Sequence, residues 1–123
     1  MKVRAFLVAD DIAVIPKGGK LVIEGVFDVI FSEIFPAKHK SLSTILIFDD
    51  EKNEFKYRLF LKHKANRIKI AGTEFTKTEK SHRIISRLND WVIAGEGEYI
   101  FEVELNDKLV ASYSVIAKIV KKI

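Results

Sequence analysis

The chain has 123 residues, 48% of them hydrophobic and 31% charged, a balance that excludes a disordered protein and suits one folded domain over residues 1–123. It has no cysteine, which excludes disulfides, thiolate metal sites and thiol nucleophiles. The net charge of +4 is only mildly basic, and no apolar run is long enough for a signal peptide or a membrane span. We therefore expect a cytoplasmic protein that does not contact a membrane.

The first part of the chain predicts strands joined by turns. Residues 2–9 are an almost continuous apolar run, typical of a strand buried on both faces near the centre of a sheet. Residues 12–15 form a second extended piece, followed by a glycine-rich turn at 16–19. The run at 20–31 then predicts a strand with two apolar faces. Gly25 in this run predicts a bulge or bend at which the chain passes from one sheet to the other.

The middle of the chain contains the clearest alternation of apolar and polar residues. Residues 32–40 are expected to form a loop, and the pair at 65–66 a turn. The polar residues 72–80 are expected to form a connection that crosses between the sheets. Strands are predicted at 41–48, 55–64 and 67–70.

The segment at 81–94 is ambiguous because its apolar residues also fit helical spacing behind Ser81 as a helix cap. Asn89 and Asp90 suit a helix interior poorly, and four residues of the segment are β-branched. We therefore predict two short strands, with Trp91 in the core. Tyr99 would then occupy the position of the corner tyrosine of many immunoglobulin-like sandwiches.

The last quarter of the chain predicts one long hairpin, because apolar residues occupy odd positions in both of its arms. A two-residue loop would place the two apolar sets on opposite faces of the hairpin. We therefore predict a three-residue loop at 105–107, with Asp107 in the left-handed region, a bulge, and Glu104 opposite Lys108. Together these elements predict an all-β fold, an Ig-like antiparallel β-sandwich of eight or nine strands.

Three stretches carry a family resemblance. They are the opening K-V-R-A-F-L-V-A-D, the central G-G-K-L-V-I-E-G-V-F-D with F-P-A-K-H after it, and R-L-N-D-W-V-I-A-G-E-G-E-Y-I-F-E-V with its hairpin. The chain thereby resembles a family of short, uncharacterised bacterial and archaeal proteins, a domain of unknown function. The resemblance implies a stand-alone Ig-like β-sandwich and a strand at 84–88. It implies no catalytic motif, cofactor or partner.

A basic face is predicted on the outward side of the strand at 55–64 and its neighbour. Cations beside an exposed aromatic ring are typical of surfaces that bind single-stranded nucleic acid, the cations contacting phosphate and the ring stacking on a base. The alternative is a solvated edge strand whose lysines prevent sheets from pairing edge to edge. The residues of this face are Lys56, Arg58, Phe60, Lys62, Lys64, Arg67 and Lys69.

A second candidate surface is a surplus of apolar residues beyond what one face of a small sandwich needs. Large exposed apolar patches on such proteins usually mark interfaces, so we expect a two-fold homodimer formed through a sheet face. The candidates for self-association are Val22, Val26, Ile30, Ile34, Phe35, Val110 and Ile116.

Catalytic signals are weak. His39, His63 and His82 are the candidates for a general base or metal ligand, and none lies at ligand spacing from another. The acidic residues at 10–11 and 49–51 lack the spacing of a calcium loop. We therefore predict no metal or cofactor, and a non-catalytic, self-associating interaction module. A single-stranded nucleic-acid-binding domain is the alternative, and an enzyme with a site invisible in sequence is the third reading.

Overall fold

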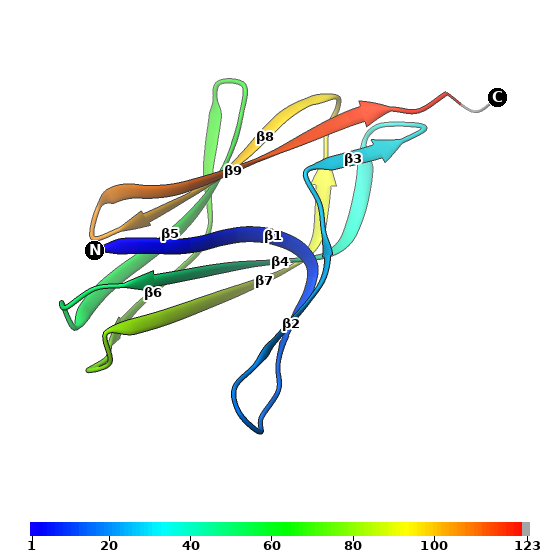
Figure 1. Ribbon diagram of the computed structural model, residues 1–123. Helices are drawn as coiled ribbons and strands as arrows, with labels where there is room; N and C mark the ends of the chain where they lie inside the picture. Colours follow the sequence, from blue (N-terminus) through cyan, green and yellow to red (C-terminus); the bar gives the residue numbers. More distant parts are fainter. Residues whose placement is uncertain (122–123) are drawn as a thin grey trace.

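The computed structural model describes residues 1–121, and within that range the chain forms nine strands and no helix (Figure 1). The strands are β1 (Lys2–Val14), β2 (Leu21–Val26), β3 (Val29–Ser32), β4 (Ala37–Asp49), β5 (Glu54–His63), β6 (Asn66–Thr76), β7 (Ser81–Ile93), β8 (Gly97–Leu105) and β9 (Lys108–Ile119). The predicted all-β fold and its strand number are confirmed.

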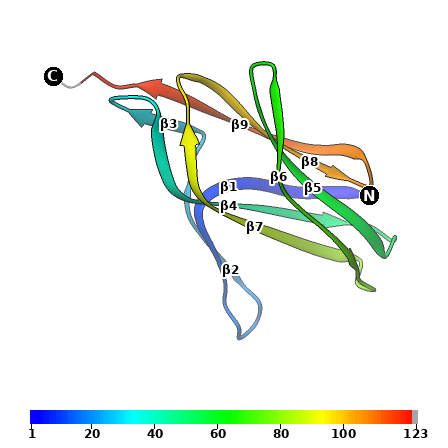
Figure 2. The ribbon, with the colours of Figure 1, turned by 180° about the vertical axis from the view of Figure 1, so that it is seen from behind.

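The strands form two sheets that face one another (Figures 1 and 2). One sheet has four strands in the order β2-β1-β4-β7, and the other has five in the order β3-β9-β8-β5-β6. All pairings are antiparallel except that of β3 with β9, which is parallel. The arrangement is therefore a β-sandwich with one exception to the antiparallel pairing that the sequence predicts. As expected from its apolar run, β1 lies inside its sheet, between β2 and β4.

The core between the sheets is built by the period-two alternation of side chains along each strand. The residues that point inward from both sheets are fully or almost fully buried, and aromatic rings fill much of the space between them. The buried members of this core include Val8, Leu42, Leu46, Phe48, Phe55, Tyr57, Leu59, Phe101 and Val103.

The β8–β9 hairpin differs from its prediction in the loop. Its turn has two residues, Asn106 and Asp107, which both have positive φ, 51° and 67°. The register then shifts by one residue, because Val103 faces Ala111 while Glu104 faces Leu109. This bulge restores the common face that a two-residue loop alone would lose. The three-residue loop and the pairing of Glu104 with Lys108 were therefore wrong, whereas the bulge and the left-handed Asp107 are confirmed.

The ambiguous segment is a single strand, β7, so both the helix and the division into two strands were wrong. Asp90, with φ of 58°, reverses the alternation within this strand. His82, Ile84 and Ser86 point inward before it, and Trp91 packs inward after it, half-buried against the rings of Tyr99 and Phe101. The Tyr99 hydroxyl donates a 2.8 Å hydrogen bond to the Gly95 carbonyl.

Several other boundaries differ because polar residues continue strands where only one face is buried. β1 extends past Asp10 and Asp11 to Val14, β4 begins at Ala37 inside the predicted loop, and β6 continues to Thr76 inside the predicted crossing connection. The turn after β5 is Lys64-Ala65 rather than 65–66.

The bend at Gly25 is confirmed. Its φ is 68°, a Cβ there would clash with the Asp10 carboxylate, and the chain changes sheets between β2 and β3.

A second, smaller core lies on the outer side of the four-stranded sheet. The hairpin of β1 and β2 turns away from the other strands of its sheet (Figure 1). Its Ile12 and the sheet residues Ala9 and Ile45 are all buried. Arg87 donates a 2.7 Å hydrogen bond to the Ile12 carbonyl, and Arg83 donates one to the carbonyl of Gly19. Half-buried residues complete this core: Leu7, Leu21, Ile23, Ile47 and Ile85.

Candidate functional site

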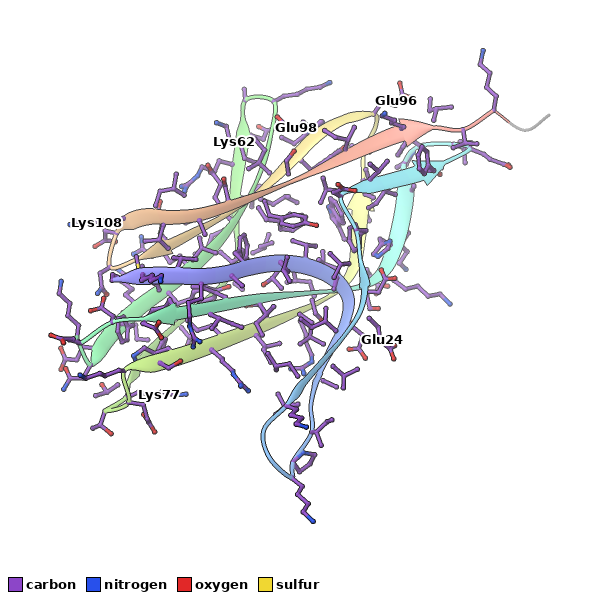
Figure 3. All side chains as sticks on the ribbon, in the orientation of Figure 1. Glu24, Lys62, Lys77, Glu96, Glu98 and Lys108 are labelled. Atoms are coloured by element: carbon purple, nitrogen blue, oxygen red, sulfur yellow. The ribbon has the colours of Figure 1, made fainter. Side chains whose placement is uncertain are left out.

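The predicted basic face is present on the outer side of the five-stranded sheet. Along β5, Lys56, Arg58, Phe60 and Lys62 alternate with the buried residues, and Lys69 and Arg67 of β6 lie opposite Phe60 and Lys62. Lys64 is the exception, because it lies in the turn with φ of 54°. Lys62 lies near the tip of the β5–β6 hairpin (Figure 3). Six of the seven predicted residues therefore share one face.

Carboxylates from β8 occupy the same face. Glu102 lies opposite Phe60, and Glu104 opposite Arg58. Arg67 reaches across β5, with Nε 2.8 Å from Glu102 Oε1 and Nη2 2.8 Å from Glu104 Oε2. Its hydrogen bonds to the two carboxylates raise the pKa of Arg67 above its usual value, so the guanidinium stays charged.

The same guanidinium covers the aromatic ring. The Arg67 Cζ lies 3.7 Å from the centre of the Phe60 ring, the position a stacked base would need. Arg58 and Lys56 approach Asp107, at 3.4 and 3.8 Å. Within residues 1–121, Lys62 and Lys69 of this face have no ion-pair partner, and neither does Lys64 in the adjoining turn. The predicted nucleic-acid surface is thus an ion-paired surface of mixed charge over most of its length.

The residues predicted for self-association do not form one face. Val22 and Val26 are exposed on β2 of the four-stranded sheet, whereas Ile116 is half-buried on β9 of the other. Ile30, Phe35 and Val110 pack against the core. The surplus seen in the sequence therefore belongs partly to the interior. The homodimer itself remains a prediction.

A different apolar surface lies where β3 and the end of β9 extend together beyond the sandwich (Figures 1 and 2). We call it the apolar end and define it by four exposed residues: Phe31 (63% exposed), Ile34 (74%), Ile119 (48%) and Val120 (40%). Ile34 was among the predicted residues. Phe31, Ile119 and Val120 were missed. The sequence pattern placed residues 29–31 in the interior, and the apolar set of the last strand was followed only to Ala117.

Ser32 holds the apolar end together. It lies opposite Ile119, its carbonyl accepts a 2.9 Å hydrogen bond from the Val120 amide, and its hydroxyl donates a 2.7 Å bond to the Ile34 carbonyl. Glu96, labelled in Figure 3, accepts a 2.6 Å bond from the Ile119 amide. These bonds fix the backbone while leaving the four apolar side chains exposed.

Two of the three histidines take part in surface contacts. His39 Nε2 lies 2.9 Å from Asp10 Oδ1, but the nearby Ser41 hydroxyl donates to the Asp10 backbone carbonyl at 3.4 Å and not to the imidazole. A histidine and a carboxylate without an aligned nucleophile do not make a hydrolase site. His63 stacks on Tyr99 with 3.9 Å between ring centroids. Residues 1–121 contain no group of three side chains placed to bind a metal.

The third histidine is buried in the core. His82 is 1% exposed and lies among aromatic rings, 4.9 Å from Phe48 and 4.8 Å from Phe55 between centroids. Neither of its ring nitrogens has a hydrogen-bond partner among the described residues. Nearby, burial raises the pKa of Tyr57, and its 3.0 Å hydrogen bond to Ser86 partly opposes this effect. His82 and Tyr57 therefore both pack in the core.

Comparison with known proteins assigns a family but no activity. Among residues 1–121, no helix has the length and apolar character to cross a membrane. A search of curated proteins found no match. A family model matches residues 4–118, almost the whole chain, and this confirms the resemblance to an uncharacterised family. The chain belongs to the Family of unknown function (DUF6941).

Proposed function

We propose that this protein is a non-catalytic interaction module that forms a two-fold homodimer through the apolar end. The observation that carries the proposal is the exposure of Phe31 and Ile34, 63% and 74%, on a projecting part of the fold. Large apolar side chains that are exposed on a part extending from a domain are typical of an interface. Burying them against a second copy removes this surface from water.

The local geometry favours a second copy of this chain as the partner. β3 is the end strand of its sheet and only four residues long, so pairing with the β3 of another copy would continue the five-stranded sheet across a two-fold axis. The rim carries both signs of charge, Glu33 and Lys118. In a two-fold arrangement a rim of mixed sign is complementary to itself.

The compartment and the finer fold class are part of the same proposal. The absence of cysteine supports a reducing, cytoplasmic location. The hydrogen bond from Tyr99 to Gly95 supports an immunoglobulin-like character for the sandwich, because it repeats the corner tyrosine of that class.

The test is light scattering coupled to gel filtration, over a range of protein and salt concentrations. We expect a dimer mass for the unchanged protein and a monomer mass for Phe31→Ser with Ile34→Ser. The matched control is Ile68→Ser with Leu109→Ser, two residues of similar exposure elsewhere (61% and 58%), which should remain dimeric. A monomer for the unchanged protein at every concentration, or equal loss in both variants, would contradict the proposal.

Single-stranded nucleic-acid binding remains the second candidate. Lys62, Lys64 and Lys69, without ion-pair partners in the described chain, favour it, and the covering of Phe60 by Arg67 disfavours it. In the same experiment, nucleic acid would appear as excess absorbance at 260 nm that high salt removes. Loss of that absorbance in Lys62→Glu with Lys64→Glu would support this candidate over the homodimer alone.

A further inference from the structure

A narrow apolar slot opens between the two sheets, on the side bordered by their end strands, β6 and β7. Its volume is about 130 Å³. The buried Leu42 and Phe101 form part of its wall, and Asn89 is its one polar residue. The remaining lining side chains are half-buried: Leu61, Ile70, Leu88 and Trp91.

Both end strands are irregular at the slot. In β6 the register shifts between Lys69 and Ala71, so that Ile70 has no partner on β5. In β7 the left-handed Asp90 turns Trp91 toward the interior. Such irregularities re-aim side chains, and they are frequent beside binding sites. Here each one directs an apolar side chain into the slot.

The slot has the size and chemistry to hold a small apolar group. An engineered cavity of about 150 Å³, lined by similar side chains, stays dry and binds benzene. A slot of 130 Å³ with one polar residue would by the same argument take a ring or chain of about five or six carbons.

The charged residues near the slot lie on the outer face of the four-stranded sheet. Lys38 lies opposite Val92, which is 60% exposed, and Lys40 follows Lys38 on the same side of β4. The two lysines line a separate, shallow depression with Asn89 and Asp90. Among the described residues, the lining of the slot therefore offers a ligand one amide group and no charge, which suits an uncharged molecule with an apolar tail.

We propose that the slot binds small uncharged amphiphiles, with the apolar chain between the sheets and the polar group at Asn89. Trp91 is the only tryptophan of the chain and lines the slot, so its fluorescence reports occupancy directly. The apolar end is made of other residues, and the slot does not depend on the oligomeric state.

The test is titration with hexanol and with hexanoate, which have the same chain length and differ in charge. We expect a saturable change in Trp91 emission with hexanol and binding of hexanoate weaker by at least about tenfold, because the lining offers its carboxylate no cation. Lys40→Ala, a change on the outer face of the sheet, should leave both affinities unchanged. Absence of a saturable change with hexanol, or equal or tighter binding of hexanoate, would overturn the proposal.

A blocked slot provides the second arm. Leu88→Phe enlarges a lining residue and should abolish binding, whereas Val92→Phe, on the exposed side of the same strand, should not. Saturation-transfer NMR on the ligand protons gives a readout independent of Trp91. If Leu88→Phe does not fold, Ile70→Phe blocks the slot from the opposite wall. Undiminished binding in a folded blocked variant would contradict the proposal.

Discussion

The two sheets protect their outer faces in different ways. The five-stranded sheet presents charged side chains, and Arg67 with Glu102 and Glu104 covers its one central ring, Phe60. The four-stranded sheet carries apolar side chains on part of its outer side, and these pack against its own β1–β2 hairpin. One face relies on ion pairs in contact with water, and the other on burial.

This difference explains why only one of the faces could be recognised from sequence. Where charge covers a face, the strand alternates apolar and polar residues, as β5 does. Where a hairpin covers a face, both sides of the strand are apolar, as in residues 5–9 of β1. Such a run indicates burial on two sides without identifying what provides the cover. The physical prediction is that disrupting the burial costs more than disrupting the ion pairs.

The largest expected effect is at Ile45, which is fully buried beneath the hairpin. Ile45→Ala should lower the free energy of unfolding by about 2–5 kcal/mol through lost burial and a residual cavity. Urea denaturation measures this loss. The control, Ile68→Ala, changes an isoleucine that is 61% exposed and should alter stability by less than about 0.5 kcal/mol. Equal effects would mean that the hairpin buries no second core.

The next effect concerns the attachment of the hairpin. Arg83→Ala with Arg87→Ala removes the two side-chain hydrogen bonds to the backbone of the hairpin. The free energy of local opening of the hairpin should fall by roughly 1–2 kcal/mol, which makes opening about tenfold more frequent. Hydrogen exchange should accelerate at β2 and stay unchanged at β5 and β8. Arg4→Ala, which removes an ion pair to Asp49 away from the hairpin, is the control. Faster exchange throughout the molecule would show instead that the hairpin does not open independently.

The third effect concerns Tyr57, a residue of the core between the two sheets, and appears as a dependence of stability on pH. Burial raises the pKa of Tyr57, so the folded state keeps the phenol protonated at a pH where the unfolded chain, with a pKa of about 10, releases it. The contribution of Tyr57 to the free energy of unfolding is therefore fully present below the pKa of the unfolded chain, and it is lost as the pH rises through the higher pKa of the folded state. Urea midpoints measured on both sides of this pH should fall less in Tyr57→Phe than in the unchanged protein. A parallel decline in the two proteins would assign the loss to other groups.

The smallest effect should be at Arg67. Because the ion pairs lie at the surface, Arg67→Ala should cost about 1 kcal/mol or less, and high salt should reduce that cost. Thermal unfolding at low and high salt, with Lys69→Ala as a control without an ion pair, measures it. A large loss that is insensitive to salt would indicate that the contact with Phe60 dominates.

Sequence reasoning succeeded where the residue pattern of one strand alone indicates which of its faces is buried. The alternation in β5 and the odd-numbered apolar set of β8 and β9 identified the buried faces correctly. It missed the left-handed Asp90, and it placed the bulge of the last hairpin in the loop instead of at Val110; each of these residues changes the phase of a strand. A bulge depends on the register of two strands, and a left-handed aspartate depends on the packing of Trp91, so neither is encoded locally.

The candidate surfaces show the same division. The cations of β5 and β6 were found because they alternate within one segment. Their neutralisation by Glu102 and Glu104 was missed, although both glutamates stand at outward positions of β8. The missing information was which strand lies beside β5. The apolar end was missed for a related reason. It is formed by the parallel pairing of β3 with β9, two strands that lie far apart in the sequence.

The attachment of the β1–β2 hairpin has a consequence for protein engineering. Arg83 and Arg87 bind carbonyl groups, which every residue type possesses, so this attachment places no demand on the side chains at the tip. Gly18 faces open space at that tip. A foreign peptide inserted after Lys17 should be displayed away from the core without loss of the fold.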